Sequence, residues 1–94
     1  MLSTIPSLIS KLSKHEFDME IARVGIIAEL DAVNLYEQLA ASALNEDLRK
    51  VLLEIAKEEK THIGEFQAFL LRLDKEQAEE LEKGRKEVKE LTGR

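Results

Sequence analysis

The sequence predicts an all-α fold in which two long helices form an antiparallel hairpin and a shorter helix follows. Of the 94 residues, 35% are charged and 44% are apolar, with one proline and four glycines. This composition is typical of long helices rather than of sheets joined by turns. Apolar side chains also recur every three or four positions over two long stretches. The length suffices for one small domain with a limited core of its own.

Three short patterns mark where the helices begin. In each, a Ser, Asn or Asp can accept a hydrogen bond from an unpaired N–H group of the first turn, and an acid or Gln follows within three residues. The patterns are Ser13-Lys14-His15-Glu16, which is a capping box, Asn45-Glu46-Asp47, and Asp74 with Gln77. They predict helices over 13–44, 45–73 and 74–92, preceded by an N-terminal arm of residues 1–12, all within a single domain of residues 1–94.

Each long helix presents one apolar stripe that polar side chains interrupt near its middle. The first stripe comprises Ala22, Ile26, Glu29, Val33, Tyr36, Ala40 and Ala43. The second comprises Leu48, Leu52, Ile55, Glu59, His62, Phe66, Phe69 and Leu73. Glu29 lies sixteen residues before Asn45, and Glu59 fourteen residues after it. With a rise of about 1.5 Å per residue, both acids reach nearly the same height in an antiparallel hairpin, and His62 lies one turn further along.

Two carboxylates and an imidazole at one level of an apolar interface indicate a metal site. Burying a carboxylate costs several kcal/mol unless a cation compensates it, and neither stripe holds a Lys or Arg at that level. A metal ion that accepts oxygen ligands and one imidazole would supply the missing charge. Glu-x-x-His by itself is a weak signal, and its weight here comes from Glu29 at the matching height. Tyr36 has two interpretations, a redox-active residue or a core aromatic bonded to a neighbouring carboxylate.

One hairpin supplies only half of such a site, and this predicts a dimer. Two helices alone would leave their stripes facing water, and Ile27, Leu30, Leu35 and Leu53 outside the stripes also need covering. Pairing two hairpins completes a four-helix bundle with four Glu and two His. That set matches the di-iron pattern of one Glu from each of two helices and Glu-x-x-His from each of the other two. We therefore predict two iron ions per dimer, shared across the interface.

Charge and residue content disfavour several other classes of partner. The formal net charge is −5 and no basic stripe is present, so nucleic acid is not expected to bind. Cysteine is absent, which excludes thiolate metal sites. No stretch approaches the roughly 20 apolar residues of a membrane span. These features predict a soluble cytoplasmic protein with no nucleic-acid or membrane partner.

The segments "AELDAVNLYEQLA" and "EEKTHIGEF" resemble the ferritin-like superfamily, and most closely the encapsulated ferritins. These are two-helix half-ferritins whose dimers build a di-iron centre at the subunit interface. The resemblance covers nearly the whole chain and implies a ferritin-like four-helix bundle. On matching positions it implies that Glu29, Glu59 and His62 are iron ligands and catalytic residues, with Tyr36 beside the centre. It further implies oxidation of Fe(II) to Fe(III) by dioxygen, a decameric ring of dimers, and mineral storage inside an encapsulin nanocompartment.

The chain departs from the family pattern at a few positions. Family members often carry acids just before and just after the central Glu, where metal ions enter; here these places hold Ala28 and Asp31. Asp31 is therefore a candidate for weak metal binding. Leu35 stands where some members have Trp. The chain ends in "KELTGR" without a recognisable targeting peptide, so we expect a truncated form or one domain of a fusion to the encapsulin shell protein.

Two alternative functions remain open at this point. The first is a non-catalytic helical oligomerisation or docking module, which would bind no stoichiometric metal. The second is another di-metal carboxylate oxidase or a rubrerythrin-like peroxidase, although such proteins usually add an electron-transfer domain with cysteines. The sequence leaves open the oligomer number, the physiological metal and the role of the N-terminal arm.

Overall fold

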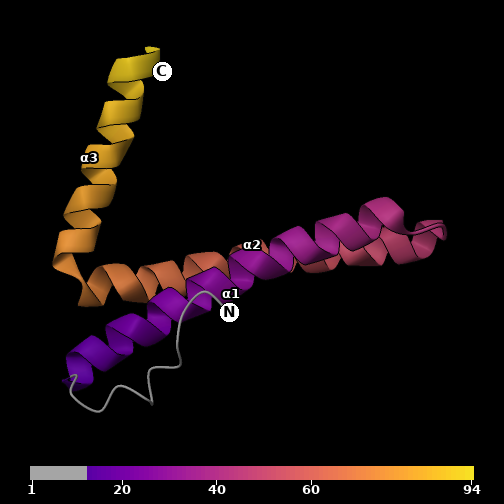
Figure 1. Cartoon of the computed structure of the whole chain (residues 1–94), viewed down its shortest axis with the longest axis horizontal. Coiled ribbons are helices and arrows are strands. Elements are labelled where there is room, and N and C mark those ends of the chain that lie inside the picture. The colour runs from indigo at the N-terminus through magenta and orange to yellow at the C-terminus, as the bar shows by residue number, and fades with distance from the viewer. Residues whose placement is uncertain (1–12) are drawn as a thin grey trace.

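The computed structural model describes residues 13–94, which form three helices. These are α1 (Lys14–Ser42), α2 (Glu46–Leu73) and α3 (Lys75–Thr92). Figure 1 shows α1 and α2 lying antiparallel and side by side, with α3 turning sharply away where α2 ends. No strand occurs within this described part of the chain. The predicted all-α class and the hairpin are therefore confirmed, whereas the arm expected over residues 1–12 lies outside the described residues.

Each helix begins at a residue whose side chain caps it. In each case the cap oxygen accepts a hydrogen bond from the backbone N–H three residues later. The pairs are Ser13 with Glu16 at 3.1 Å, Asn45 with Leu48 at 2.9 Å, and Asp74 with Gln77 at 3.0 Å. Helix α1 ends at Ser42, two residues before the expected Leu44, because the backbone of Ala43 is already extended (φ −67°, ψ 133°).

The short turn between α1 and α2 is held by Arg49. Helix α1 has no basic residue in its last turn, so its final carbonyls need donors from elsewhere. The Arg49 side chain supplies them from α2. Its Nε atom donates to the carbonyl of Ala40 at 3.1 Å, and its Nη2 atom donates to that of Ala43 at 2.9 Å. The side chain thereby ties the first turn of α2 to the last turn of α1.

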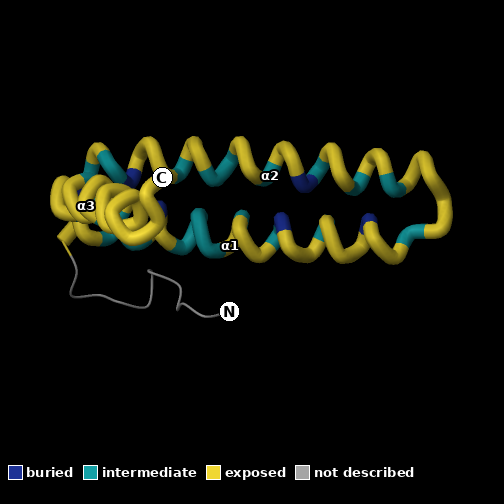
Figure 2. The backbone as a smooth tube through the Cα atoms, turned by 90° about the horizontal axis from the view of Figure 1, so that it is seen from above, coloured by how far each residue is buried: buried dark blue, intermediate teal, exposed yellow. Residues whose placement is uncertain are grey.

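The core is a narrow seam between α1 and α2. The buried apolar residues are Ala22, Val33 and Ala40 on α1 and Ala56 and Leu70 on α2, and Figure 2 shows the buried positions of both helices facing each other. Some members of the stripe expected on α2 remain exposed in the single chain, as expected for two helices alone, and the buried surface of α2 extends beyond that stripe. Leu48 and Phe69 are 51% and 58% exposed, whereas Ala56 and Leu70, outside that stripe, face α1. The apolar surface of α2 is wider than one neighbouring helix can cover, so much of it remains exposed to solvent.

Large apolar side chains are exposed on both sides of the hairpin. They include Ile21, Leu35, Leu39, Leu48, Val51 and Phe69, together with Leu30 and Leu53. At about 100° per residue, Leu30 and Leu53 lie on one side of the seam, and Leu39 and Leu48 lie on the other. Exposed apolar rows of this kind mark interaction surfaces.

The corner between α2 and α3 is fixed by Asp74. This residue is buried, and besides capping α3 it pairs with Arg23 of α1 at 2.7 Å. Helix α3 has no buried residue of its own, and its charges pair along its surface, as in Arg85 with Glu82 at 2.7 Å. None of the three helices combines the length and the apolar run that crossing a bilayer requires.

Candidate metal centre

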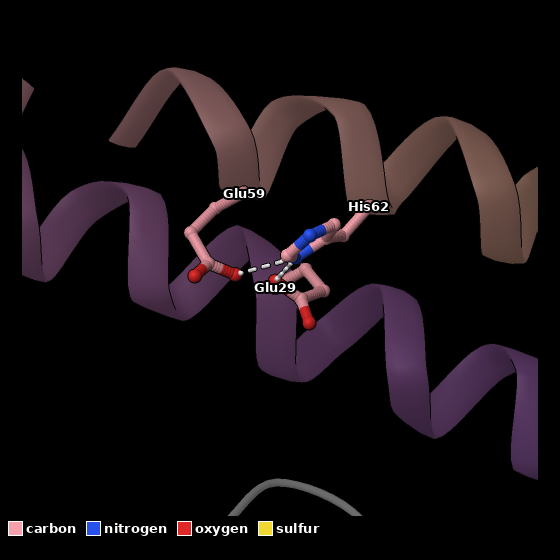
Figure 3. Close-up of side chains that lie close together, drawn as sticks. All are labelled: Glu29, Glu59 and His62. Atoms are coloured by element: carbon pink, nitrogen blue, oxygen red, sulfur yellow. Dashed lines mark hydrogen bonds and ion pairs between the residues drawn. The ribbon is translucent and has the colours of Figure 1, made fainter. Parts of the chain in front are cut away.

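Three side chains that the sequence singled out converge halfway along the hairpin. Glu29 comes from α1, and Glu59 and His62 come from successive turns of α2; Figure 3 shows them pointing toward one another. The Nδ1 atom of His62 lies 3.4 Å from Oε2 of Glu29 and 3.4 Å from Oε2 of Glu59. One ligand atom from each residue can be chosen so that all three lie within 4.8 Å of one another. The convergence expected from residue counting is therefore present in the fold.

The cluster contains one carboxylate oxygen without a hydrogen-bond donor. The Nδ1 atom of His62 is in hydrogen-bond geometry with Glu59, in the tautomer that carries a proton there. Oε2 of Glu29 is at the same distance from Nδ1, but it is buried and has no hydrogen-bond partner among the described residues. A single ring N–H points along one direction, so it serves Glu59 and leaves Oε2 of Glu29 without a donor. A buried acceptor without a partner is destabilising by about 1–3 kcal/mol.

Within residues 13–94, neither of these two carboxylates forms an ion pair with a Lys or Arg side chain. Arg23 is paired with Asp74 at the α2–α3 corner, and Lys60 is paired with Glu37 at 3.4 Å. Glu29 and Glu59 are only 20% and 18% exposed at the side chain. Two acids held this close and this far from water repel each other and lose hydration. The cluster therefore has a deficit of positive charge that His62 alone does not remove.

The donor set fits a divalent metal ion of the first transition row. Carboxylate oxygens and an imidazole nitrogen are the ligands that Fe(II) and its neighbours accept in proteins, and a cation would supply the partner that Oε2 of Glu29 lacks. The His62 side chain is 44% exposed, so the cluster opens to the surface rather than into a closed cavity. Three donors from one chain leave the coordination of such an ion incomplete.

The other residues expected near the centre lie apart from this cluster. Tyr36 is half-buried, two turns along α1 from Glu29. Among the described residues, no hydrogen bond joins its hydroxyl to the carboxylates, so the bonded interpretation is not met within one chain. Asp31 is exposed and does not belong to the cluster. Its role in metal binding stays a prediction.

The stripe pattern gave no reason to single out Gly25, which is packed beside the cluster. It lies one turn before Glu29 and directly under the ring of Phe66. The sequence nevertheless held a clue to this close packing, because Gly25 is the one glycine of α1. Glycine inside a helix is less favourable than Ala by about 1 kcal/mol, and its presence there often has a packing reason.

A helical hairpin with Glu on one helix and Glu-x-x-His on the other defines a class of carboxylate–histidine metal proteins with ferritin-like architecture. Comparison with known proteins identifies the family within that class. The EncFtn-like family model matches residues 5–87, and the chain belongs to that family. The resemblance to encapsulated ferritins is thereby confirmed.

The relatives agree with this assignment. The chain is 57% identical over 96 residues to a ferritin-like-encapsulin shell fusion protein of Pyrococcus furiosus. It is 42% identical over 64 residues to the encapsulin nanocompartment cargo protein EncC of Myxococcus xanthus. The alignments cover 99% and 65% of this chain but only 28% and 49% of the two relatives. This chain therefore spans less than half of either curated relative.

A solved structure matches the whole fold. The encapsulated ferritin domain from Pyrococcus furiosus superimposes with a TM-score of 0.85 at 56% sequence identity, covering 100% of this chain and 98% of that one. At this identity and coverage the two chains share one overall fold. The ferritin-like class predicted from the sequence is confirmed at the level of the single chain.

Proposed function

We propose that this protein is a ferroxidase, which oxidises Fe(II) to Fe(III) with dioxygen at a di-iron centre built by two copies of the chain. The observation that carries the proposal is the cluster of Glu29, Glu59 and His62, with ligand atoms within 4.8 Å of one another and a buried carboxylate oxygen that lacks a partner. In a purely structural hairpin, two buried carboxylates without a cation would only reduce the stability of the fold.

In this proposal, Fe(II) is the substrate and the three side chains bind it. Before the metal ion arrives, the contact between His62 and Glu59 at 3.4 Å holds both side chains near the positions that ligands need. Binding through Nδ1 requires that nitrogen to lose its proton, which a neutral imidazole does by carrying the proton on Nε2 instead. Each bound Fe(II) would give up one electron, so two ions together would deliver two electrons to one dioxygen, which would take up two protons from water. The carboxylates of a dimer, four in number, balance the charge of two Fe(II) ions.

The second copy is needed for two independent reasons. The cluster offers three donors, and a matching set from another chain would complete the pattern of the di-iron carboxylate bundles. The exposed apolar residues on the same side of the hairpin, such as Leu48 and Phe69, would be covered by that copy. Burial of apolar surface is the main driving force for such association. Assembly of dimers into a larger ring follows the family resemblance.

We further propose that the protein works with an encapsulin shell and is located inside the compartment that the shell forms. The support comes from the two curated relatives, one named as a fusion with an encapsulin shell and the other as an encapsulin cargo protein. In this setting the oxidised iron would be stored as mineral in the compartment, because a helical hairpin dimer encloses no storage cavity of its own.

The experiment that tests the proposed function combines iron analysis, an aerobic Fe(II) oxidation assay and the solution mass of the purified protein. The expected result is about one iron per chain in a dimeric or larger assembly, with oxidation faster than in buffer. A metal-free monomer that does not accelerate oxidation would contradict the proposal and favour the docking-module alternative.

Substitution at the cluster makes this test specific. Glu59→Ala and His62→Ala should reduce Fe(II) oxidation to the background rate while leaving the helical circular dichroism unchanged. Glu58→Ala is the matched control, because Glu58 is the preceding residue of α2 and is exposed. It should retain the wild-type rate. Wild-type rates in both cluster variants would rule out these residues as ligands.

A further inference from the structure

Gly25 and Phe66 form a close contact between α1 and α2 that leaves no room for a Cβ atom at position 25. A Cβ atom placed on Gly25 would lie 2.7 Å from Cδ1, 2.8 Å from Cε1 and 2.9 Å from Cγ of Phe66. The optimal separation of two carbon atoms is about 3.5–4.0 Å. The ring of Phe66 therefore rests against the bare backbone of α1, in the space that a side chain would occupy.

This contact lies beside the metal cluster on both helices at once. Gly25 precedes Glu29 by one turn of α1, and Phe66 follows His62 by one turn of α2. Since the two helices are antiparallel, both residues lie on the side of the cluster that is away from the hairpin loop. A helix is stiff over a single turn. The separation of α1 and α2 at the Gly25 contact is therefore transmitted to the Glu29 carboxylate and the His62 ring.

The ring cannot easily move aside to admit a larger residue. One of the three close atoms is Cγ, which is bonded directly to the Cβ of Phe66 and is not the free end of a flexible chain. Relieving the overlap requires either a different χ1 rotamer of Phe66 or a wider spacing of the helices. A new rotamer moves the ring along α2, and wider spacing separates Glu29 from its partners. Both outcomes alter the ligand geometry.

We infer that Gly25 is a positioning residue for the metal centre. Its missing side chain admits the Phe66 ring, and the resulting close packing sets the distance across which Glu29 and His62 meet. Gly25 does not touch the metal ion and acts through Phe66. This inference rests on the proposed function, because it assumes that the cluster binds a metal ion.

Gly64 provides an internal control within the same hairpin. It lies in α2, two residues after His62, and a Cβ atom added there would meet nothing within 4 Å. Ala is the better helix former than Gly at both positions. On helix propensity alone, Gly25→Ala and Gly64→Ala would therefore have the same effect. A difference between them reports the packing at Gly25.

The test is a Co(II) titration of the whole chain, followed by the visible d–d absorption bands. Their position and intensity depend on the coordination geometry, which a merely structural change leaves unaltered. The proteins are wild type, Gly25→Ala, Gly64→Ala, Phe66→Leu and Gly25→Ala/Phe66→Leu, compared at equal concentration, helix content and solution mass. Gly25→Ala is expected to weaken Co(II) binding about tenfold or more and to change the d–d spectrum. Gly64→Ala should match the wild type.

The double variant identifies Phe66 as the route of the effect. With the ring removed, an Ala at position 25 has room, so Gly25→Ala/Phe66→Leu should bind Co(II) within about twofold of Phe66→Leu. A double variant much weaker than Phe66→Leu, or a Gly25→Ala protein indistinguishable from wild type, overturns the inference and leaves the proposed function standing. Absence of Co(II) binding by the wild type overturns both. Should Gly25→Ala fail to fold, Phe66→Leu and the double variant can still be compared. A double variant that binds Co(II) much more weakly than Phe66→Leu would still overturn the inference.

Discussion

Arg23 and Asp74 are 51 residues apart in the sequence, yet the Nη2 atom of Arg23 donates a hydrogen bond of 2.7 Å to Oδ2 of Asp74. The other carboxylate oxygen of Asp74 accepts the backbone N–H of Gln77 at 3.0 Å. One buried side chain thus caps the N-terminus of α3 and ties this end of the helix to α1. The direction in which α3 leaves the hairpin depends on this pair.

The Arg23–Asp74 pair predicts a specific loss of stability in acid. The Gln77 N–H and then the Arg23 guanidinium hold the pKa of Asp74 below its usual value of 3.8. For an acid with a lowered folded pKa, the stabilisation is complete above the unfolded pKa and is lost as the pH falls through the folded one. Asp74→Asn, which keeps a capping side chain, should lower the Tm by about 2–4 °C at pH 7. The difference between the two proteins should shrink as the pH falls below 3.8.

Thermal unfolding of the metal-free protein from pH 7 to pH 2.5 measures this effect. Asp31→Asn is the control, because Asp31 is exposed in the middle of α1. It should follow the wild type at every pH. If the difference in Tm between wild type and Asp74→Asn stayed constant from pH 7 to pH 2.5, the charge of Asp74 would not be the cause of the stability difference.

The partnerless oxygen of Glu29 predicts opposite effects with and without metal. In the metal-free protein, Glu29→Gln removes one of two neighbouring acids and adds a donor, so it should be neutral or stabilising by up to about 1 kcal/mol. With saturating Co(II), the wild type should gain stability by binding to the folded state, and Glu29→Gln should gain much less. Urea unfolding with and without Co(II) measures both. Glu65→Gln, at an exposed acid of α2, is the control and should change neither the metal-free stability nor the gain with Co(II). A metal-free Glu29→Gln protein less stable than the wild type would contradict the argument that the two acids repel each other.

The exposed apolar residues of α2 predict that a substitution which prevents assembly also reduces Fe(II) oxidation. Leu48 and Phe69 flank the cluster along α2, and both are more than half exposed in the single chain. Leu48→Glu or Phe69→Glu would place a charge in the proposed dimer interface and would leave the three ligand residues unchanged. Each should reduce the solution mass and the Fe(II) oxidation rate, and higher protein concentration should restore both by mass action.

Sedimentation velocity and the oxidation assay at several concentrations test this coupling. Leu44→Glu supplies the control, because Leu44 is 98% exposed in the hairpin loop, away from the seam. Monomeric variants that oxidise iron at the wild-type rate would show that one chain is sufficient.

The meeting of Glu29, Glu59 and His62 was predictable because it depends on counting residues from a short turn at a fixed rise. The helix starts were predictable for a similar reason, since caps are local. The exposure of Leu48 and Phe69 in the single chain was also expected, because two helices alone cannot cover their stripes. The burial of Ala56 and Leu70 was not predicted, because the apolar surface of α2 extends beyond the stripe and the pattern does not say which edge faces α1. The Arg23–Asp74 pair and the Gly25–Phe66 contact join residues far apart in sequence, and neither leaves a periodic signal.

The loop after α1 is short and is held by Arg49. The number of residues between Glu29 and Glu59 therefore determines where these two side chains meet. Inserting a single residue in the helical segments between Glu29 and Glu59 would shift one acid relative to the other by about 1.5 Å along the axis and turn it by about 100°. The same insertion in the charged middle of α3 would leave the cluster untouched. The segment between these two acids is therefore expected to accept many substitutions on its exposed face but hardly any gain or loss of residues. Insertions and deletions, more than point changes, set the limit on how this hairpin can vary.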